Sequence, residues 1–281
     1  MSPQHKKIAS IISAIFLAIV IFLTTISLIF IDNRTVEFEF FKLTHSNTLG
    51  EEIVIVHISD THFPRISVDI HTMLKDIESK KPDIIAITGD IIDGGVIAES
   101  GVFEFIKGVV QIAPVFYVDG NHENNHSDVQ NLYDFLESKG VVFLRDKHVT
   151  LNIRGAYITI VGLLDCATSG IEYTLPHATN NHFIITLVHR PNRVSRTLTE
   201  NTNFIAPDLV LAGHVHGGQW RIFGRGLLCP DTIFFPRYQA GLYQFDTIRN
   251  TRMIVSRGLG NSIVPFRFNN RPHIPVITVA F

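Results

Sequence analysis

The chain has 281 residues, a hydrophobic fraction of 46% and a formal net charge of −2. A net charge this close to zero gives no reason to expect a nucleic acid or another polyanion as a partner. Two cysteines, Cys166 and Cys229, are too few for a disulfide framework. They are expected to be buried thiols, with a single disulfide as the alternative.

The first segment of the chain is apolar. Ile8–Ile31 contains 24 residues and no charged side chain; as a helix it would be roughly 36 Å long, enough to cross a bilayer core of about 30 Å. A cleaved signal peptide has a shorter apolar stretch and a small-residue exit, whereas this stretch continues directly into Asp32. We therefore predict a transmembrane anchor at residues 1–31 and a tether at residues 32–51. The basic residues on its two sides are nearly balanced, so the side of the membrane that carries the rest of the chain stays open.

From residue 52 onward, short apolar runs alternate with helical patterns. The runs are rich in Ile and Val and show little polar alternation, which is typical of strands covered on both faces. Strand–helix alternation favours an α/β layered domain, which we place at residues 52–281. The predicted strands are Ile53–Ile58, Ile84–Thr88, Val115–Val118, Tyr157–Gly162, Phe183–Val188, Leu209–Ala212, Met253–Ser256 and Val276–Phe281, and the predicted helices are Val68–Lys80, Glu99–Ile112, Ser127–Lys139 and Pro191–Glu200.

Five of the predicted strands are followed directly by side chains that can hold metal ions. In open α/β sheets the carboxyl ends of the strands form the binding crevice, so these side chains are expected to lie together. Residues i and i+2 of an extended chain point the same way, which suits Asp-x-His and His-x-His spacings for one pair of ions. Two further histidines are expected elsewhere, His57 in the core and His273 at the surface. The candidate side chains are Asp60 and His62, Asp90 and Asp93, Asn121 and His122, His189, and His214 and His216.

The ordered motifs resemble those of the calcineurin-like metallophosphoesterase superfamily over roughly residues 52–281. The resemblance implies a four-layer αββα sandwich with two divalent metal ions in one site. Mixed carboxylate and imidazole ligands suit manganese, with zinc or iron as alternatives. Transferred motif by motif, the ligands of one metal would be Asp60, His62 and His216, those of the other would be Asn121, His189 and His214, and Asp90 would bridge the two.

The same resemblance gives His122 a catalytic role. It would face the substrate and protonate the leaving group, a contribution of about 10²- to 10⁴-fold in rate. Asp93 would orient His122, and a simple Asp-Gly turn with Gly94 is the alternative for Asp93. Two cations in the site would activate a water molecule and clamp the phosphoryl oxygens.

The motif at His214–Gln219 narrows the resemblance. Its sequence, His-x-His-Gly-Gly-Gln, is similar to that of a membrane-associated phosphodiesterase subfamily. Some members of that subfamily are UDP-2,3-diacylglucosamine pyrophosphatases of lipid A biosynthesis. The resemblance implies hydrolysis of a membrane-associated phosphodiester or pyrophosphate by a single-pass protein of the inner (cytoplasmic) membrane. A soluble nucleotide substrate, with the anchor setting location only, is the alternative. A catalytically inactive scaffold is disfavoured because no ligand of the motif set is missing.

Basic and aromatic residues interleave after the last ligand motif. From Trp220 to Phe281 there are eight arginines, no lysine and two acidic residues. Arginine forks bind phosphate, and apolar side chains beside them would receive acyl chains. Arg221, Arg225 and Arg237 are therefore candidate substrate-binding residues. The alternative is a hairpin that packs on the sandwich and turns a basic face to solvent.

Overall fold

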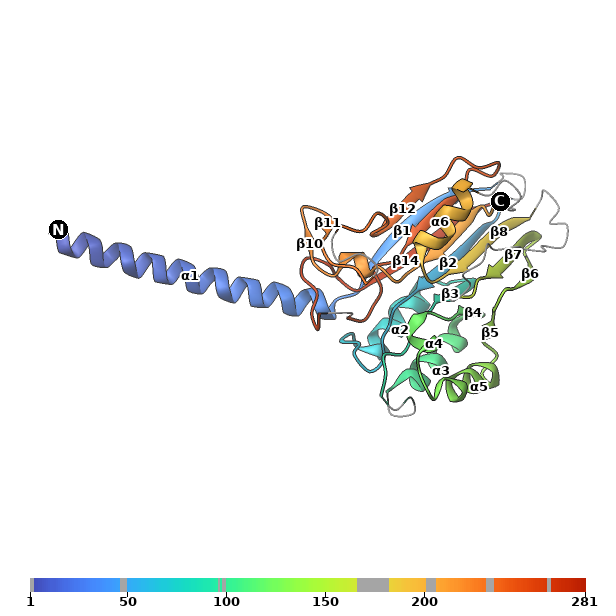
Figure 1. Ribbon diagram of the computed structural model, residues 1–281, viewed down its shortest axis with the longest axis horizontal. Coiled ribbons are helices and arrows are strands. Elements are labelled where there is room, and N and C mark those ends of the chain that lie inside the picture. Colours follow the sequence, from blue (N-terminus) through green and yellow to red (C-terminus); the bar gives the residue numbers. More distant parts are fainter. Residues whose placement is uncertain are drawn as a thin grey trace.

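The computed structural model describes residues 3–45, 50–95, 97, 100–165, 182–200, 206–230, 235–261 and 264–281. Two six-stranded sheets lie face to face, and helices cover the outer face of each sheet (Figure 1). Cys166 lies outside the described residues, so both alternatives for its pairing with Cys229 stay open. Cys229 itself is buried.

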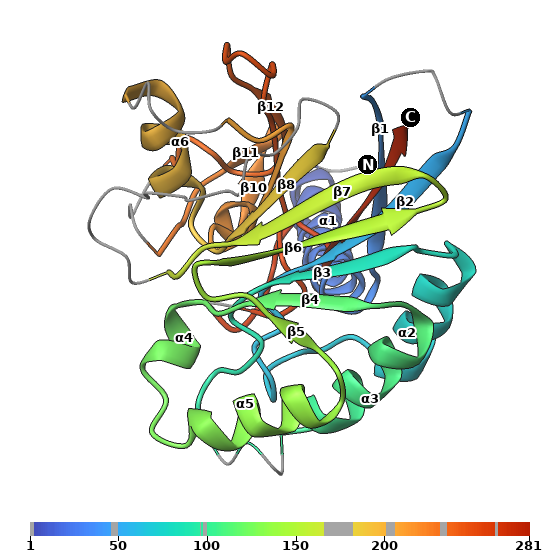
Figure 2. The ribbon, with the colours of Figure 1, turned by 90° about the vertical axis from the view of Figure 1, so that its right-hand side faces the viewer.

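The first sheet has the strand order β1-β14-β2-β3-β4-β5. Strands β2 to β5 are parallel to one another, whereas β14 runs antiparallel to β2 and parallel to β1. Three amphipathic helices cover the outer face of this sheet (Figure 2). The strands are β1 (Glu37–Thr44), β2 (Glu52–Ile58), β3 (Ile84–Thr88), β4 (Val115–Val118), β5 (Val142–Phe143) and β14 (His273–Ala280), and the helices are α2 (Ile70–Ser79), α3 (Val102–Ile112) and α5 (Val129–Ser138).

The second sheet has the strand order β12-β13-β9-β8-β7-β6. Helix α6 covers its outer face through Val194, which packs in a cluster with Val210 and Met253. A separate apolar core, to which Phe116 and Phe183 belong, fills the space between the two sheets. The predicted αββα order of layers is confirmed. The elements are β6 (Lys147–Ile153), β7 (Ala156–Gly162), β8 (Phe183–Val188), α6 (Pro191–Glu200), β9 (Leu209–Ala212), β12 (Gly241–Gln244) and β13 (Arg252–Val255).

The strands that carry the site were predicted most closely. Strands β3, β4, β8 and β9 have the predicted bounds, and every residue in them is buried. Strands β1 and β6 were not predicted. They alternate exposed and half-buried residues and lie at sheet edges. An edge strand with one solvated face carries too few apolar residues to stand out in a sequence.

Helix α1 (Pro3–Arg34) projects from the body of the molecule (Figure 1). It has 32 residues, its most apolar stretch has a mean hydropathy of 2.9, and none of that stretch is buried. By length and composition it is able to cross a membrane. The predicted tether at residues 32–51 is wrong over Glu37–Thr44, because this segment is strand β1 and pairs along its whole length with β14. Only two residues, Thr35 and Val36, separate α1 from the sheet.

The last turn of α1 is fastened to the body by side chains. The Asn33 amide clamps the backbone of Arg267: its Nδ2 donates to the Arg267 carbonyl at 3.0 Å, and its Oδ1 accepts from the Arg267 N–H at 2.8 Å. The neighbouring Asp32 carboxylate accepts from the Asn269 N–H and faces Arg271 at 3.7 Å. The helix therefore enters the body at a fixed point.

Two of the other histidines test the predicted core. His57 is fully buried as expected, with its Nε2 at 2.8 Å from the Thr88 hydroxyl. His273 was predicted at the surface, but it is fully buried. It begins β14, which lies inside the sheet between β1 and β2, and its Nδ1 accepts from the Arg257 N–H at 3.2 Å.

The buried His57 makes the fold sensitive to acid. Burial lowers the pKa of His57 to about 3 from 6.5, so the unfolded chain binds a proton between these values that the folded chain rejects. Stability should therefore fall as the pH falls through this window, by about 2–3 kcal/mol between about pH 7 and about pH 4.5. Urea unfolding of the detergent-solubilised wild-type and His57→Gln chains at both pH values measures how much of the pH dependence of stability comes from His57. Equal pH dependence in the two proteins would exclude His57 as its source.

Candidate metal centre

The candidate side chains lie where the carboxyl ends of five strands meet. Those of β2, β3 and β4 belong to the first sheet, and those of β8 and β9 belong to the second. Backbone hydrogen bonds join the strand ends: the Asp60 N–H donates to the Gly89 carbonyl and the Gly213 N–H to the His189 carbonyl, each at 3.0 Å. The site is thus assembled across both sheets, and all seven predicted metal ligands reach it.

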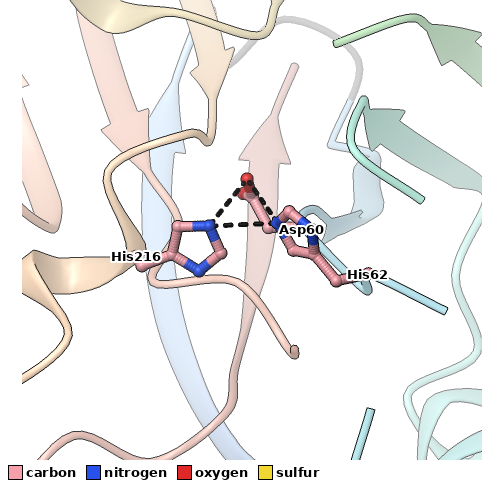
Figure 3. A group of neighbouring side chains, drawn as sticks. All are labelled: Asp60, His62 and His216. Carbon is pink, nitrogen blue, oxygen red and sulfur yellow. Dashed lines mark hydrogen bonds and ion pairs between the residues drawn. The ribbon is translucent and has the colours of Figure 1, made fainter. Parts of the chain in front are cut away.

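Asp60, His62 and His216 form one cluster of ligand atoms (Figure 3). The Nε2 atoms of the two histidines are 3.1 Å apart, and they lie 3.9 Å (His62) and 3.5 Å (His216) from Asp60 Oδ1. The Asp60 carboxylate is held in place by the His214 N–H, which is 3.0 Å from both of its oxygens. A side chain on Gly213 would overlap this carboxylate, so only glycine fits there.

Asp90, His189 and His214 form a second cluster. His189 Nε2 lies 3.1 Å from Asp90 Oδ2, 3.1 Å from His214 Nδ1 and 3.2 Å from Asn121 Oδ1. The other ring nitrogen of His189 is 2.8 Å from the Thr88 carbonyl, to which its N–H donates. This bond fixes the tautomer and aims the Nε2 lone pair at the cluster, as is usual for metal-binding histidines.

The backbone at this site is strained. Five of the seven candidate ligands have positive φ angles between 49° and 71°. Non-glycine residues adopt this region at a cost, and they persist in it mainly at functional sites. Strain at five candidate ligands accords with a functional site, although turn residues such as Lys81 and Arg154 have similar φ angles. The five residues are Asp60, His62, Asp90, His214 and His216.

The donor set fits divalent cations. Two carboxylates, Asp60 and Asp90, are almost fully buried, and buried carboxylates require a positive partner. Burial lowers the pKa of His62 and His216, so both rings are neutral near neutrality and offer lone pairs. Burial also disfavours charge on His189, yet Asp90 raises the pKa of His189 to about 10. A cation between them would replace that proton.

A cavity opens on the two clusters, and His122 stands at its edge. Its Nδ1 is 2.8 Å from Asp93 Oδ1, and its Nε2 lies 3.9 Å from Asp90 Oδ2. The Asp93 carboxylate is thus within hydrogen-bond distance of the His122 ring, whether or not Asp93 also forms a turn. Burial disfavours the charged ring, but the hydrogen bond with Asp93 and the Asp90 carboxylate raise the pKa of His122. The cavity is lined by Arg65, Asp90, Asp93, Asn121, His122, His214, His216 and Pro230.

The predicted arginines do not reach this cavity. Arg221, half-buried, donates from its guanidinium to the carbonyls of Gly217 and Gly224, so it serves the hairpin that follows the site. Arg225 and Arg237 are exposed, and none of the three is among the described residues that line the cavity. Local composition indicated that arginines lie near the site, but it did not indicate where their side chains point.

Arg65 is the cavity arginine that the sequence did not reveal. It follows His62 by three residues, and its Nη1 lies 2.7 Å from Asp93 Oδ2. Its side chain is 60% exposed, which leaves the guanidinium accessible from the cavity. A single arginine in a turn carries no distinguishing pattern.

Glu123 was also missed, although it belongs to the Gly-Asn-His-Glu motif. Its carboxylate is fully buried and accepts four backbone N–H groups within 3.2 Å. Burial and the neighbouring Asp90 raise the pKa of Glu123 to about 7. Glu123 therefore holds the turn that carries Asp90 against the turn that carries Asn121 and His122. The donors are Asp90, Ile91, Ile92 and Gly120.

Glu123→Gln should destabilise the chain. A glutamine has one acceptor oxygen, and its amide nitrogen would face donors, so about 3 kcal/mol of unfolding free energy should be lost. Chemical denaturation measures this, and metal content should fall with it. Glu137→Gln, at an exposed position on α5, is the matched control. A stability equal to that of the control would show that the four donors find other acceptors.

Residues 53–218 match the family model for calcineurin-like phosphoesterases. The chain belongs to the calcineurin-like phosphoesterase family. It is 30% identical over 238 residues to the uncharacterized metallophosphoesterase YkuE of Bacillus subtilis, a match that covers 80% of this chain and 78% of that protein. An uncharacterized metallophosphoesterase of Aquifex aeolicus is 30% identical over 247 residues, covering 82% of this chain and 86% of the relative.

A third relative is bovine. It is named a transmembrane protein with metallophosphoesterase domain, and it is 27% identical over 246 residues, which is 78% of this chain and 51% of the relative.

Membership in the calcineurin-like phosphoesterase family makes the chain a phosphoester hydrolase that uses divalent metal ions, and the two clusters are its candidate metal sites.

Proposed function

We propose that the chain is a two-metal hydrolase that cleaves a phosphodiester or pyrophosphate bond of a membrane-associated substrate such as UDP-2,3-diacylglucosamine. One observation carries the two-metal part. Asp90 Oδ2 lies 3.1 Å from His189 Nε2 in one cluster and 3.9 Å from His62 Nε2 in the other. A buried carboxylate oxygen between two imidazole clusters is suited to bridging a pair of cations.

The donors divide into two sets around Asp90. Manganese suits their mixture of carboxylate, imidazole and amide groups, with zinc or iron as alternatives. Such ions, when bound, supply positive charge that acidifies a water molecule and neutralises phosphoryl oxygens. Asp60, His62 and His216 would hold one ion, Asn121, His189 and His214 the other, and Asp90 both.

The remaining cavity residues act on the substrate. Asp93 holds His122 by its Nδ1, which leaves Nε2 to give a proton to the departing oxygen. The raised pKa of His122 keeps that proton available near neutrality. Arg65, held at the cavity by Asp93, offers N–H donors to a phosphate oxygen.

The membrane part of the proposal rests on α1. We propose that residues 1–31 anchor the chain in the inner (cytoplasmic) membrane and that residues 52–281, together with β1, form the catalytic domain. Arg225 and Arg237 are exposed on the segment that follows the site and remain available to anionic headgroups.

A substrate comparison tests the proposal. The full-length chain, purified in detergent with Mn²⁺, should hydrolyse bis-p-nitrophenyl phosphate and should prefer UDP-2,3-diacylglucosamine to a water-soluble UDP-sugar. A preference for the soluble nucleotide by orders of magnitude would establish the alternative, in which α1 only sets location. No turnover of any of these esters with any divalent metal would overturn the proposed hydrolysis.

A further inference from the structure

A small hairpin follows the last metal-ligand motif. Strands β10 (Arg221–Ile222) and β11 (Arg225–Gly226) pair antiparallel, and Phe223 and Gly224 form the turn between them. Phe223 is 99% exposed and Ile222 is 46% exposed. The tip of this hairpin therefore turns an aromatic and an aliphatic side chain towards the outside of the molecule.

The turn itself does not favour Phe223. Phe223 has φ 50° and Gly224 has φ 76°, so both central residues are left-handed, as in a type I′ turn. Such turns strongly prefer Asn, Asp or Gly at the first of these positions. A bulky aromatic residue there is a genuine outlier and costs stability. The hairpin thus places an exposed aromatic residue at a turn position where Asn, Asp or Gly would cost less, and no packing inside the molecule accounts for this ring, since Phe223 is 99% exposed.

The base of the hairpin is joined to the end of α1. Asn269 Nδ2 donates to the Arg221 carbonyl at 3.2 Å, and the Asn269 backbone N–H donates to the Asp32 carboxylate. A further bond, from the Arg221 N–H to the Phe268 carbonyl at 3.0 Å, fixes the same edge. Figure 1 shows β10 and β11 on the side of the body from which α1 projects.

The surroundings of the tip are amphipathic. Phe235, 65% exposed, lies beside the hairpin because its N–H donates to the Leu227 carbonyl at 3.3 Å. Arg225 and Arg237 are exposed on the same segment. Aromatic and aliphatic side chains combined with arginines fit the boundary between acyl chains and anionic headgroups. A lipid surface is favoured over a protein partner because the same edge is tied to a helix that is able to cross a bilayer.

We propose that the β10–β11 hairpin is a second membrane contact, which inserts Phe223 and Ile222 into the bilayer interface beside α1. Beyond the hairpin the chain runs through Leu227 to Pro230, and Pro230 lines the catalytic cavity. The contact would therefore hold one wall of the cavity at the lipid surface. The inference rests on the proposed anchoring by α1 but not on the proposed hydrolysis, since the hairpin would meet the bilayer whether or not the site is active.

Quenching of tryptophan fluorescence tests the contact. The chain has one tryptophan, so Phe223→Trp adds one emitter at the hairpin tip. The full-length variant is placed in nanodiscs of phosphatidylcholine and phosphatidylglycerol with brominated or unbrominated acyl chains. The loss of intensity on bromination, after subtraction of the wild-type signal, should be several-fold larger than for Ile248→Trp.

Ile248 is the matched control because it is 91% exposed and lies at the other end of the second sheet. The adjacent Arg249 bonds to the His182 carbonyl at the start of β8, whereas the site lies at the end of β8. No quenching at position 223, or equal quenching at both positions, would overturn the proposal. Phe223→Asn, which suits the turn, should in addition lower activity on lipid-phase substrates while leaving hydrolysis of water-soluble esters unchanged.

Discussion

Asp90→Asn should abolish both metal loading and hydrolysis. The substitution keeps the size of the side chain but removes the charge that lies between the two histidine clusters. Asp90 Oδ1 also accepts a hydrogen bond from the backbone N–H of His122 at 2.8 Å. The amide oxygen of asparagine can accept the same bond. The backbone should therefore survive, whereas kcat/KM should fall at least about 10³-fold.

Metal analysis separates this loss from misfolding. The wild-type chain should bind two ions, and Asp90→Asn should bind one or none while its circular dichroism is unchanged. Asp76→Asn, on the exposed face of α2, provides the matched control and should behave as the wild type. Two tightly held ions in Asp90→Asn would refute the bridging role.

His122→Ala should lower the rate without removing metal. The imidazole stands at the cavity edge with 35% of its side chain exposed, and in the proposed mechanism it donates a proton to the departing oxygen and is not a metal ligand. We expect kcat to fall about 10²- to 10³-fold for an ester with an alkoxide leaving group. The loss should be much smaller for a p-nitrophenolate leaving group, because that anion departs without a proton.

The dependence on leaving group is the decisive measurement. His126→Ala is the control, since His126 is a half-buried histidine four residues further on and its Nε2 faces the Gly95 carbonyl, outside the candidate metal clusters. Asp93→Asn should show the same dependence in weaker form, because it leaves the imidazole in place but removes the carboxylate that orients it. An equal loss for both leaving groups would assign His122 to substrate binding instead.

The gathering of the candidate metal ligands could be predicted because each follows a strand that is apolar on both faces. Ile84–Thr88 and Leu209–Ala212 are such strands, and the polar residue after each stands out against them. Arg65 could not be predicted in this way, because its position depends on how the turn after His62 folds back towards Asp93. The contacts of Arg221 could not be predicted for a related reason: its charge was evident, but the carbonyls of Gly217 and Gly224 to which it donates are brought to it only by the folded chain.

The prediction of a tether was wrong over residues 37–44 because this segment is a strand, and its partner is the C-terminal strand β14, more than two hundred residues away. Glu37 and Glu39 alternate with Phe38 and Phe40, a weak pattern that pairing with β14 turns into regular structure. Long-range pairing of this kind leaves no local trace in composition.

The clamp of Asn33 on Arg267 has a consequence for what the enzyme can reach. The guanidinium of Arg267 lies 3.5 Å from His216 Nδ1, so one arginine separates the last turn of α1 from the metal centre. With α1 anchored in a bilayer as proposed, this arginine, the contact of Asp32 with Asn269 and the pairing of β1 with β14 together would hold the candidate metal centre close to the lipid. A substrate of the proposed hydrolysis would then have to bring its scissile bond close to the headgroup plane, which would favour short lipid-linked phosphates over groups displayed on long stalks.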